Sequence, residues 1–144
     1  MDFIERLIYA LTETHPIHPM IVHFPIGLTG AAFLFIVLAL WKNKDFFEQA
    51  AFANIALATI GTLAAGLTGM YDNQITYTGE APNAGLKMIL AIILLLITTV
   101  TTVARWRNPD LLDKLKALYV GAYTISFGLA IVLAFLGGVI LYGF

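Results

Sequence analysis

The sequence predicts an all-α protein, a four-transmembrane-helix bundle preceded by a short N-terminal interfacial helix. Hydrophobic residues occupy 60% of its 144 positions and charged residues only 12%, against about 45–50% and 25% in soluble domains. A 15.7 kDa globule cannot bury that much apolar surface, so the chain needs a lipid bilayer as a second solvent. The absence of cysteine excludes disulfides, thiolate metal sites and cysteine nucleophiles.

Four apolar runs support this prediction, because each can cross a hydrocarbon core of about 30 Å as a helix. They cover roughly residues 20–41, 50–70, 84–104 and 115–141. The polar breaks between them leave no room for a soluble domain, so residues 1–144 are expected to form a single integral membrane domain. The runs are continuous and not alternating, which favours helices over a barrel.

The segment before the first run has apolar residues at helical spacing. This pattern predicts a short amphipathic helix lying in the membrane interface, with a frayed terminus as the alternative. The segment opens with acidic residues and lacks the basic region of a signal peptide. The apolar positions are Phe3, Ile4, Leu7, Ile8 and Leu11.

Basic residues are distributed unevenly between the two sides of the predicted bundle. The first and third breaks hold six of the eight, and the other side holds Arg6 and Lys87. The positive-inside rule therefore places these breaks in the cytoplasm and both termini on the outer, periplasmic side of a bacterial inner membrane. A net charge of −1 and a pI of about 6.2 leave no basic face for nucleic acid.

The second run carries a stripe of small or polar residues spaced by three and four. Such stripes let membrane helices approach closely, so we expect Gly61 and Ala65 to lie at a helix interface within the bundle. An oligomer, including a homo-oligomer, could use the same stripe. Its members are Asn54, Ala58, Gly61, Ala65 and Gly69.

All three histidines lie within nine residues, between prolines. Pro19 suits the first helical position, with His18 near the cap and His15 just before it, and both are candidate cofactor ligands together with His23. Pro25 removes a helical hydrogen bond to the Ile21 carbonyl, which His23 is placed to contact. We expect a kinked, polar mouth on the outer side.

His23 is the central candidate, because an ionisable group inside a span indicates function. It could bridge two helices, bind a metal or cofactor, or take part in proton transfer. Consecutive antiparallel spans are neighbours, so Asp72 is expected to accept a hydrogen bond from its ring and orient it. Tyr71, Tyr142 and His18 could complete the site.

At this segment the chain resembles a family of small bacterial membrane proteins called domain of unknown function 2231, DUF2231. Two weaker stretches, at residues 64–72 and 136–142, occur in the same order and spacing, so the resemblance covers nearly the whole chain. The specific stretch is His15-Pro-Ile-His18-Pro-Met-Ile-Val-His23-Phe-Pro25-Ile-Gly27-Leu28.

The resemblance implies a four-helix membrane protein without assigned enzymatic activity. Some relatives are fused to cytochrome or iron–sulfur domains, which implies a redox setting. Many have a histidine at the start of the third span, where this chain has Lys87 and Met88, so a bis-histidine haem from separate helices is not expected. Haem b could still be bound by His23 with Met70 or Met88, and a chlorophyll-type pigment needs one axial ligand.

Three functions remain open. The first is a non-enzymatic accessory or cofactor-binding subunit of a membrane electron-transfer complex, and the second is a purely structural subunit of a larger redox or photosynthetic complex. The third, a proton-linked transporter, is disfavoured because no acidic residue lies in the middle of a span. A hydrolase is not expected, because the only serine, Ser126, lies in an apolar span without a nearby base.

Overall fold

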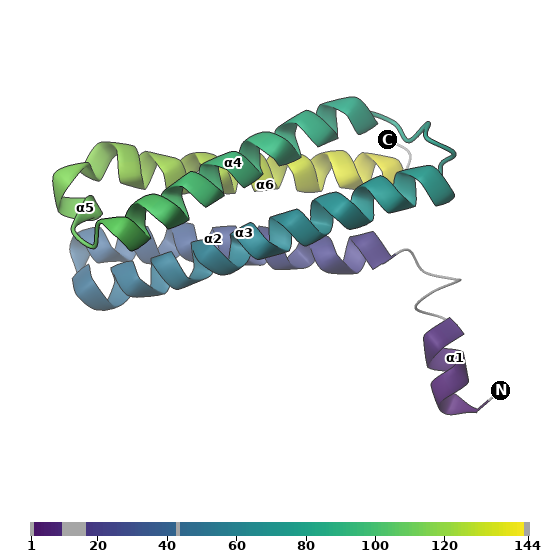
Figure 1. Cartoon of the computed structure of the whole chain (residues 1–144), viewed down its shortest axis with the longest axis horizontal. Coiled ribbons are helices and arrows are strands. Elements are labelled where there is room, and N and C mark those ends of the chain that lie inside the picture. Colours follow the sequence, from purple (N-terminus) through teal and green to yellow (C-terminus); the bar gives the residue numbers. More distant parts are fainter. Residues whose placement is uncertain (1, 10–16, 43, 143–144) are drawn as a thin grey trace.

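The computed structural model describes residues 2–9, 17–42 and 44–142 of the chain. Within them, four long helices run up and down side by side (Figure 1). They are α2 (Ile17–Trp41), α3 (Lys44–Ile75), α4 (Ala84–Arg107) and α6 (Lys116–Tyr142). All four are long and apolar enough to cross a membrane, which confirms the predicted fold class.

Two short helices complete the described chain. The first, α1 (Phe3–Tyr9), agrees with the predicted N-terminal helix, and its Phe3, Ile4 and Ile8 side chains are exposed. The second, α5 (Leu111–Lys114), lies in the third polar break, where the sequence predicted no helix. Leu112 of α5 is buried in the bundle core, so this turn closes one end of the bundle.

Each long helix packs against two others, so that the contacts α2–α3, α3–α4, α4–α6 and α6–α2 form a closed ring. Glycines allow the closest approaches. A Cβ atom on Gly61 would lie 3.2 Å from Cδ of the buried Pro25, and one on Gly30 would lie 3.1 Å from the Phe127 ring. The prediction that Gly61 and Ala65 lie at a helix interface is therefore confirmed.

Helix α2 differs from expectation at its start. It begins at Ile17, two residues before the predicted first position at Pro19, and continues through Pro25. Pro19 then falls in the first turn, where backbone N–H groups have no hydrogen-bond partner within the helix. The N–H group that proline lacks is therefore not needed for a helical hydrogen bond at this position.

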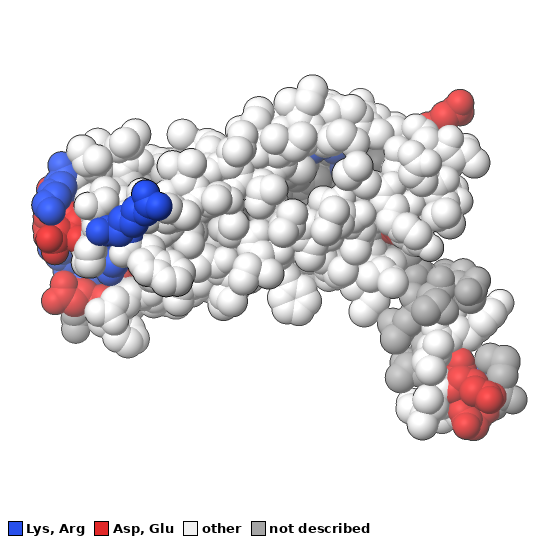
Figure 2. Space-filling view, in the orientation of Figure 1, with Lys and Arg blue, Asp and Glu red and all other residues white. Residues whose placement is uncertain are grey.

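Charged side chains gather at one end of the bundle, and most of its flank is uncharged in this view (Figure 2). We call this end, formed by the α2–α3 turn and residues 105–116, the basic end. The opposite end, formed by the first turns of α2 and α4 and the last turns of α3, is the histidine end. Large apolar side chains such as Leu34, Ile60 and Val100 face outward between the two ends, as a bilayer requires.

Candidate functional site

Asp72 caps helix α2 at the histidine end. Its Oδ2 atom accepts a hydrogen bond of 3.3 Å from the backbone N–H of His18, and the residue is only 7% exposed. A carboxylate at this position accepts a hydrogen bond from a backbone N–H group that has no partner within the helix. Its negative charge also interacts favourably with the positive end of the helix dipole. Asp72 therefore joins the end of α3 to the start of α2.

The His18 ring lies against α3. Its Nδ1 atom is 3.2 Å from the Thr68 hydroxyl oxygen, and the Thr68 hydroxyl donates to the carbonyl of Ala64 at 2.9 Å. Because the single hydroxyl hydrogen is already used, His18 Nδ1–H must be the donor to Thr68. The ring packs over Gly69, where a Cβ atom would lie 2.8 Å from His18 Cε1.

Replacing Gly69 with alanine is expected to displace the His18 ring and break its hydrogen bond with Thr68. A contact of 2.8 Å is too short for two carbon atoms, so the ring must move. The melting temperature in detergent should fall, and the His18 imidazole resonances should shift. The matched control is Gly66→Ala on the same helix, where a Cβ atom meets nothing within 4 Å and the gain in helix propensity is equal. Equal melting temperatures and unchanged resonances for the two variants would contradict this arrangement.

The predicted pairing of His23 with Asp72 is wrong, because Asp72 bonds His18 instead. His23 lies on an exposed face of α2, and its Nδ1–H donates to the carbonyl of Pro19, one turn earlier, at 2.5 Å. The expected contact with the Ile21 carbonyl is therefore not the bond that His23 makes. Five residues separate His18 from His23, about 140° around a helix, so only one of them can face α3.

The other predicted residues are spread around the histidine end. Met70, Met88 and Tyr71 are 54%, 43% and 64% exposed. Across the α2–α3 interface, Pro25 contacts Gly61 and His18 contacts Gly69. His23 therefore lies at about the same depth as Leu63. Met70 is seven residues beyond Leu63 on α3, which is about 10 Å along the helix axis. His15 and the side chain of Tyr142 lie outside the described part of the structure.

The basic end holds a buried charged cluster that the sequence analysis missed. Glu48 of α3 is 5% exposed and accepts two hydrogen bonds from Arg105 of α4, at 2.5 Å from Nε and 2.7 Å from Nη2. The Tyr119 hydroxyl of α6 donates to Glu48 Oε1 at 2.9 Å. Arg105 also lies over the Phe52 ring, 5.2 Å from its centroid, a favourable cation–π geometry.

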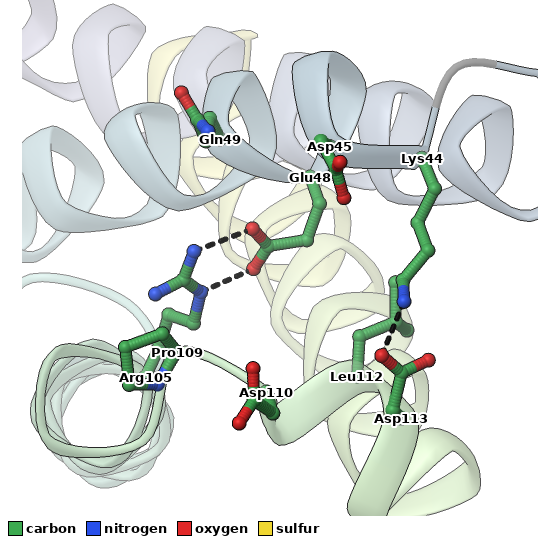
Figure 3. Close-up of a pocket in the computed structure, with 9 residues that line it drawn as sticks. All are labelled: Lys44, Asp45, Glu48, Gln49, Arg105, Pro109, Asp110, Leu112 and Asp113. Atoms are coloured by element: carbon green, nitrogen blue, oxygen red, sulfur yellow. Dashed lines mark hydrogen bonds and ion pairs between the residues drawn. The ribbon is translucent and has the colours of Figure 1, made fainter.

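A pocket of about 250 Å³ opens beside this cluster. Figure 3 shows the Arg105 guanidinium facing the Glu48 carboxylate from the opposite wall, while Lys44 reaches Asp113. Glu48 of α3 and Arg105 of α4 thus both line the pocket. The pocket is lined by Lys44, Asp45, Glu48, Gln49, Arg105, Pro109, Asp110, Leu112 and Asp113.

A signal for this cluster was present in the sequence. Glu48 lies in the first polar break and Arg105 in the third, so both were assigned to the same side of the membrane. Tyr119 and Tyr123 are four residues apart, which places them on one face of a helix. The sequence does not show that Glu48 and Arg105 turn toward each other, because that depends on how each helix is rotated about its axis.

Four long apolar helices with charged groups collected at their ends define an integral membrane protein. The chain belongs to DUF2231, the family described as a predicted membrane protein, whose family model matches residues 14–144. No curated protein and no solved structure is significantly similar to it.

Proposed function

We propose that this protein is a non-enzymatic membrane subunit that binds a planar metal-containing cofactor, of the haem b or chlorophyll type, on the outward face of α2. His23 is the proposed axial ligand. The observation that carries the proposal is the hydrogen bond that the His23 ring makes through Nδ1. Nδ1 donates to the Pro19 carbonyl, so a neutral ring keeps its lone pair on Nε2, the nitrogen that binds metals.

The surface around His23 suits a flat ring. Gly27, one turn further along the same face, has nothing within 4 Å of its Cβ position. Met20, one turn earlier, and Phe24 beside it are 54% and 67% exposed. A macrocycle bound at Nε2 would therefore rest on soft, apolar side chains next to an open glycine.

The energetics of the membrane support the same proposal. His23 lies six residues into α2, about 9 Å along the axis, where an unsatisfied polar atom is unfavourable. No group of three or more His, Asp or Glu residues that could hold a metal occurs among the described residues. A cofactor that brings its own equatorial ligands and needs one protein ligand is therefore the better match.

This position also suggests a partner. A ring bound at His23 lies outside the four-helix bundle, so its far side faces lipid or another protein. An accessory subunit of a redox complex, or a second copy of this chain, would cover it. The purely structural reading, in which α2 only packs against other membrane subunits, predicts no bound chromophore.

Titration of the purified protein with haem b in mild detergent tests the proposal. We expect a Soret band of a histidine-ligated haem, and at least a tenfold weaker affinity for His23→Ala. Addition of imidazole to the His23→Gly variant should restore the band, because the free ligand replaces the missing ring. Zinc chlorin provides the same test for a chlorophyll-type pigment.

The control is His18→Ala, which removes a histidine whose ring packs against Gly69 and Thr68. It should retain cofactor binding. If neither haem b nor zinc chlorin binds the wild-type protein, or if His23→Ala binds them equally well, the cofactor proposal is wrong and the structural reading is favoured.

A further inference from the structure

Lys87 of α4 is a half-buried cation without a partner. Its side chain makes no hydrogen bond or ion pair with the described residues, and no charged side chain among them acts on it electrostatically. The two buried carboxylates of the same residues are both satisfied, Glu48 by Arg105 and Asp72 by the backbone of His18. Because an ionisable group inside a span is unfavourable unless it is paired, Lys87 indicates an anion that the described residues do not supply.

Lys87 lies on the inward face of α4. Leu94 and Thr101, seven and fourteen residues further along the helix, are only 3% and 5% exposed, and seven residues are close to two helical turns. Leu86 and Ile89, on either side of this face, are 49% and 59% exposed. The Lys87 side chain therefore begins on the side of α4 that faces the bundle and not on the side that faces lipid.

His18 and Asp72 lie on the inward faces of α2 and α3 at the histidine end. His18 is seven residues before the buried Pro25, and Asp72 accepts a hydrogen bond from its backbone N–H. The Lys87 ammonium is close enough to the His18 ring to act on it electrostatically. Since α2 and α4 are diagonal in the ring of helices, this interaction crosses the interior of the bundle.

Gly137 of α6 leaves space at the same depth. It is seven residues beyond Ala130, which is 1% exposed, so it lies on the inward face, yet a Cβ atom there would meet nothing within 4 Å. The contact of Gly30 with Phe127 relates the depths of α2 and α6. His18 precedes Gly30 by twelve residues and Gly137 follows Phe127 by ten, about 18 Å and 15 Å along their helices. The interior is therefore open beside Gly137 at the level of the histidine ring.

We propose that Lys87 binds an anionic oxygen group inside the histidine end of the bundle, in the space beside Gly137. The ammonium has three donors and no acceptor, so it matches the oxygens of an anion. Asp72 is held at α2 by the N–H of His18, which leaves the ammonium free for the ligand. Because Lys87 carries one positive charge and Asp72 a negative one, a singly charged carboxylate or phosphodiester is the better match.

Thermal unfolding in nanodiscs of neutral phosphatidylcholine tests the unpaired charge first. Without a carboxylate or phosphate in the buffer, Lys87→Met should melt at a higher temperature than the wild type, because an apolar side chain of similar length replaces an unpaired charge. The control is Lys116→Met, which removes the same charge from an exposed position at the basic end. It should melt close to the wild-type temperature.

The anion is then added in two arms, because a lipid headgroup and a free anion share this chemistry. Phosphatidylglycerol or oleate in the nanodisc tests the lipid source, and acetate or dimethyl phosphate in the buffer tests the free source. In the arm that provides the ligand, the melting temperatures of the wild type and of Lys116→Met should rise with concentration. The apparent affinity of Lys87→Met should be at least tenfold weaker.

Filling the space tests its role without removing the charge. Gly137→Leu should remain folded, because a Cβ atom there meets nothing within 4 Å, and it should lose the response to the anion. Gly128→Leu is the matched control on the same helix. Its Cβ position is equally free of contacts, but Gly128 is exposed, so this variant should respond like the wild type.

The proposal is overturned if none of the four anions raises the melting temperature of the wild type, or if Lys87→Met responds as strongly. Equal melting temperatures for Lys87→Met and the wild type in the neutral nanodisc would show that water already satisfies the ammonium, which would also overturn it. None of these results bears on cofactor binding at His23, which lies on the outward face of α2.

Discussion

Replacing Arg105 with leucine is expected to lower the free energy of unfolding by about 3–5 kcal/mol, the range for breaking a buried ion pair from one side. The side chains of Arg105 and Glu48 are 13% and 6% exposed. Without Arg105 the Glu48 carboxylate keeps only the hydrogen bond from Tyr119 and remains a buried charge. Thermal or SDS-induced unfolding in mixed micelles provides the measurement.

Two comparisons isolate the cause of this loss. The double variant Glu48→Leu/Arg105→Leu removes both charges and should recover much of the lost stability, because apolar replacement of a buried pair is often neutral. Lys44→Ala breaks the exposed pair with Asp113 and should have little effect. Wild-type stability for Arg105→Leu would show that Glu48 does not depend on its ion pair.

Replacing Gly61 with leucine is expected to destabilise the bundle by about 1–3 kcal/mol through overpacking. A Cβ atom at this position lies 3.2 Å from Pro25 Cδ and 3.4 Å from Pro25 N. The pyrrolidine ring is closed onto the backbone and cannot rotate away, so α2 and α3 must separate. Their separation would also disturb the contacts of His18 with Thr68 and Gly69, two turns further along α3.

Gly66→Leu is the matched control, since a Cβ atom there meets nothing within 4 Å. The two variants gain the same helix propensity and lie five residues apart on the same helix. We expect Gly66→Leu to unfold close to the wild-type temperature. If Gly61→Leu is as stable as Gly66→Leu, the close approach of α2 and α3 at Pro25 does not exist in solution.

The transmembrane architecture could be predicted from the residues alone. Lipid leaves the backbone no outside hydrogen-bond partner, so each run of about 20 apolar residues must form a helix. Short breaks then make consecutive helices antiparallel, and the spacing of Gly61 and Ala65 placed them correctly at an interface. These inferences depend on length, composition and spacing, which are read directly from the chain.

The pairing of polar side chains could not be predicted from the residues, because it depends on how the helices pack together. The sequence gives the depth of a residue along its helix, and on that basis Asp72 was assigned to the wrong histidine. It also placed Glu48 and Arg105 at the same end without pairing them. In a soluble helix the apolar stripe shows which face turns inward, whereas α2 is apolar on nearly all sides because lipid and the bundle interior are both apolar. The rotation of α2 and α3 about their axes is therefore set by close packing at Pro25, Gly61 and Gly69, and this rotation decides which of their polar groups meet.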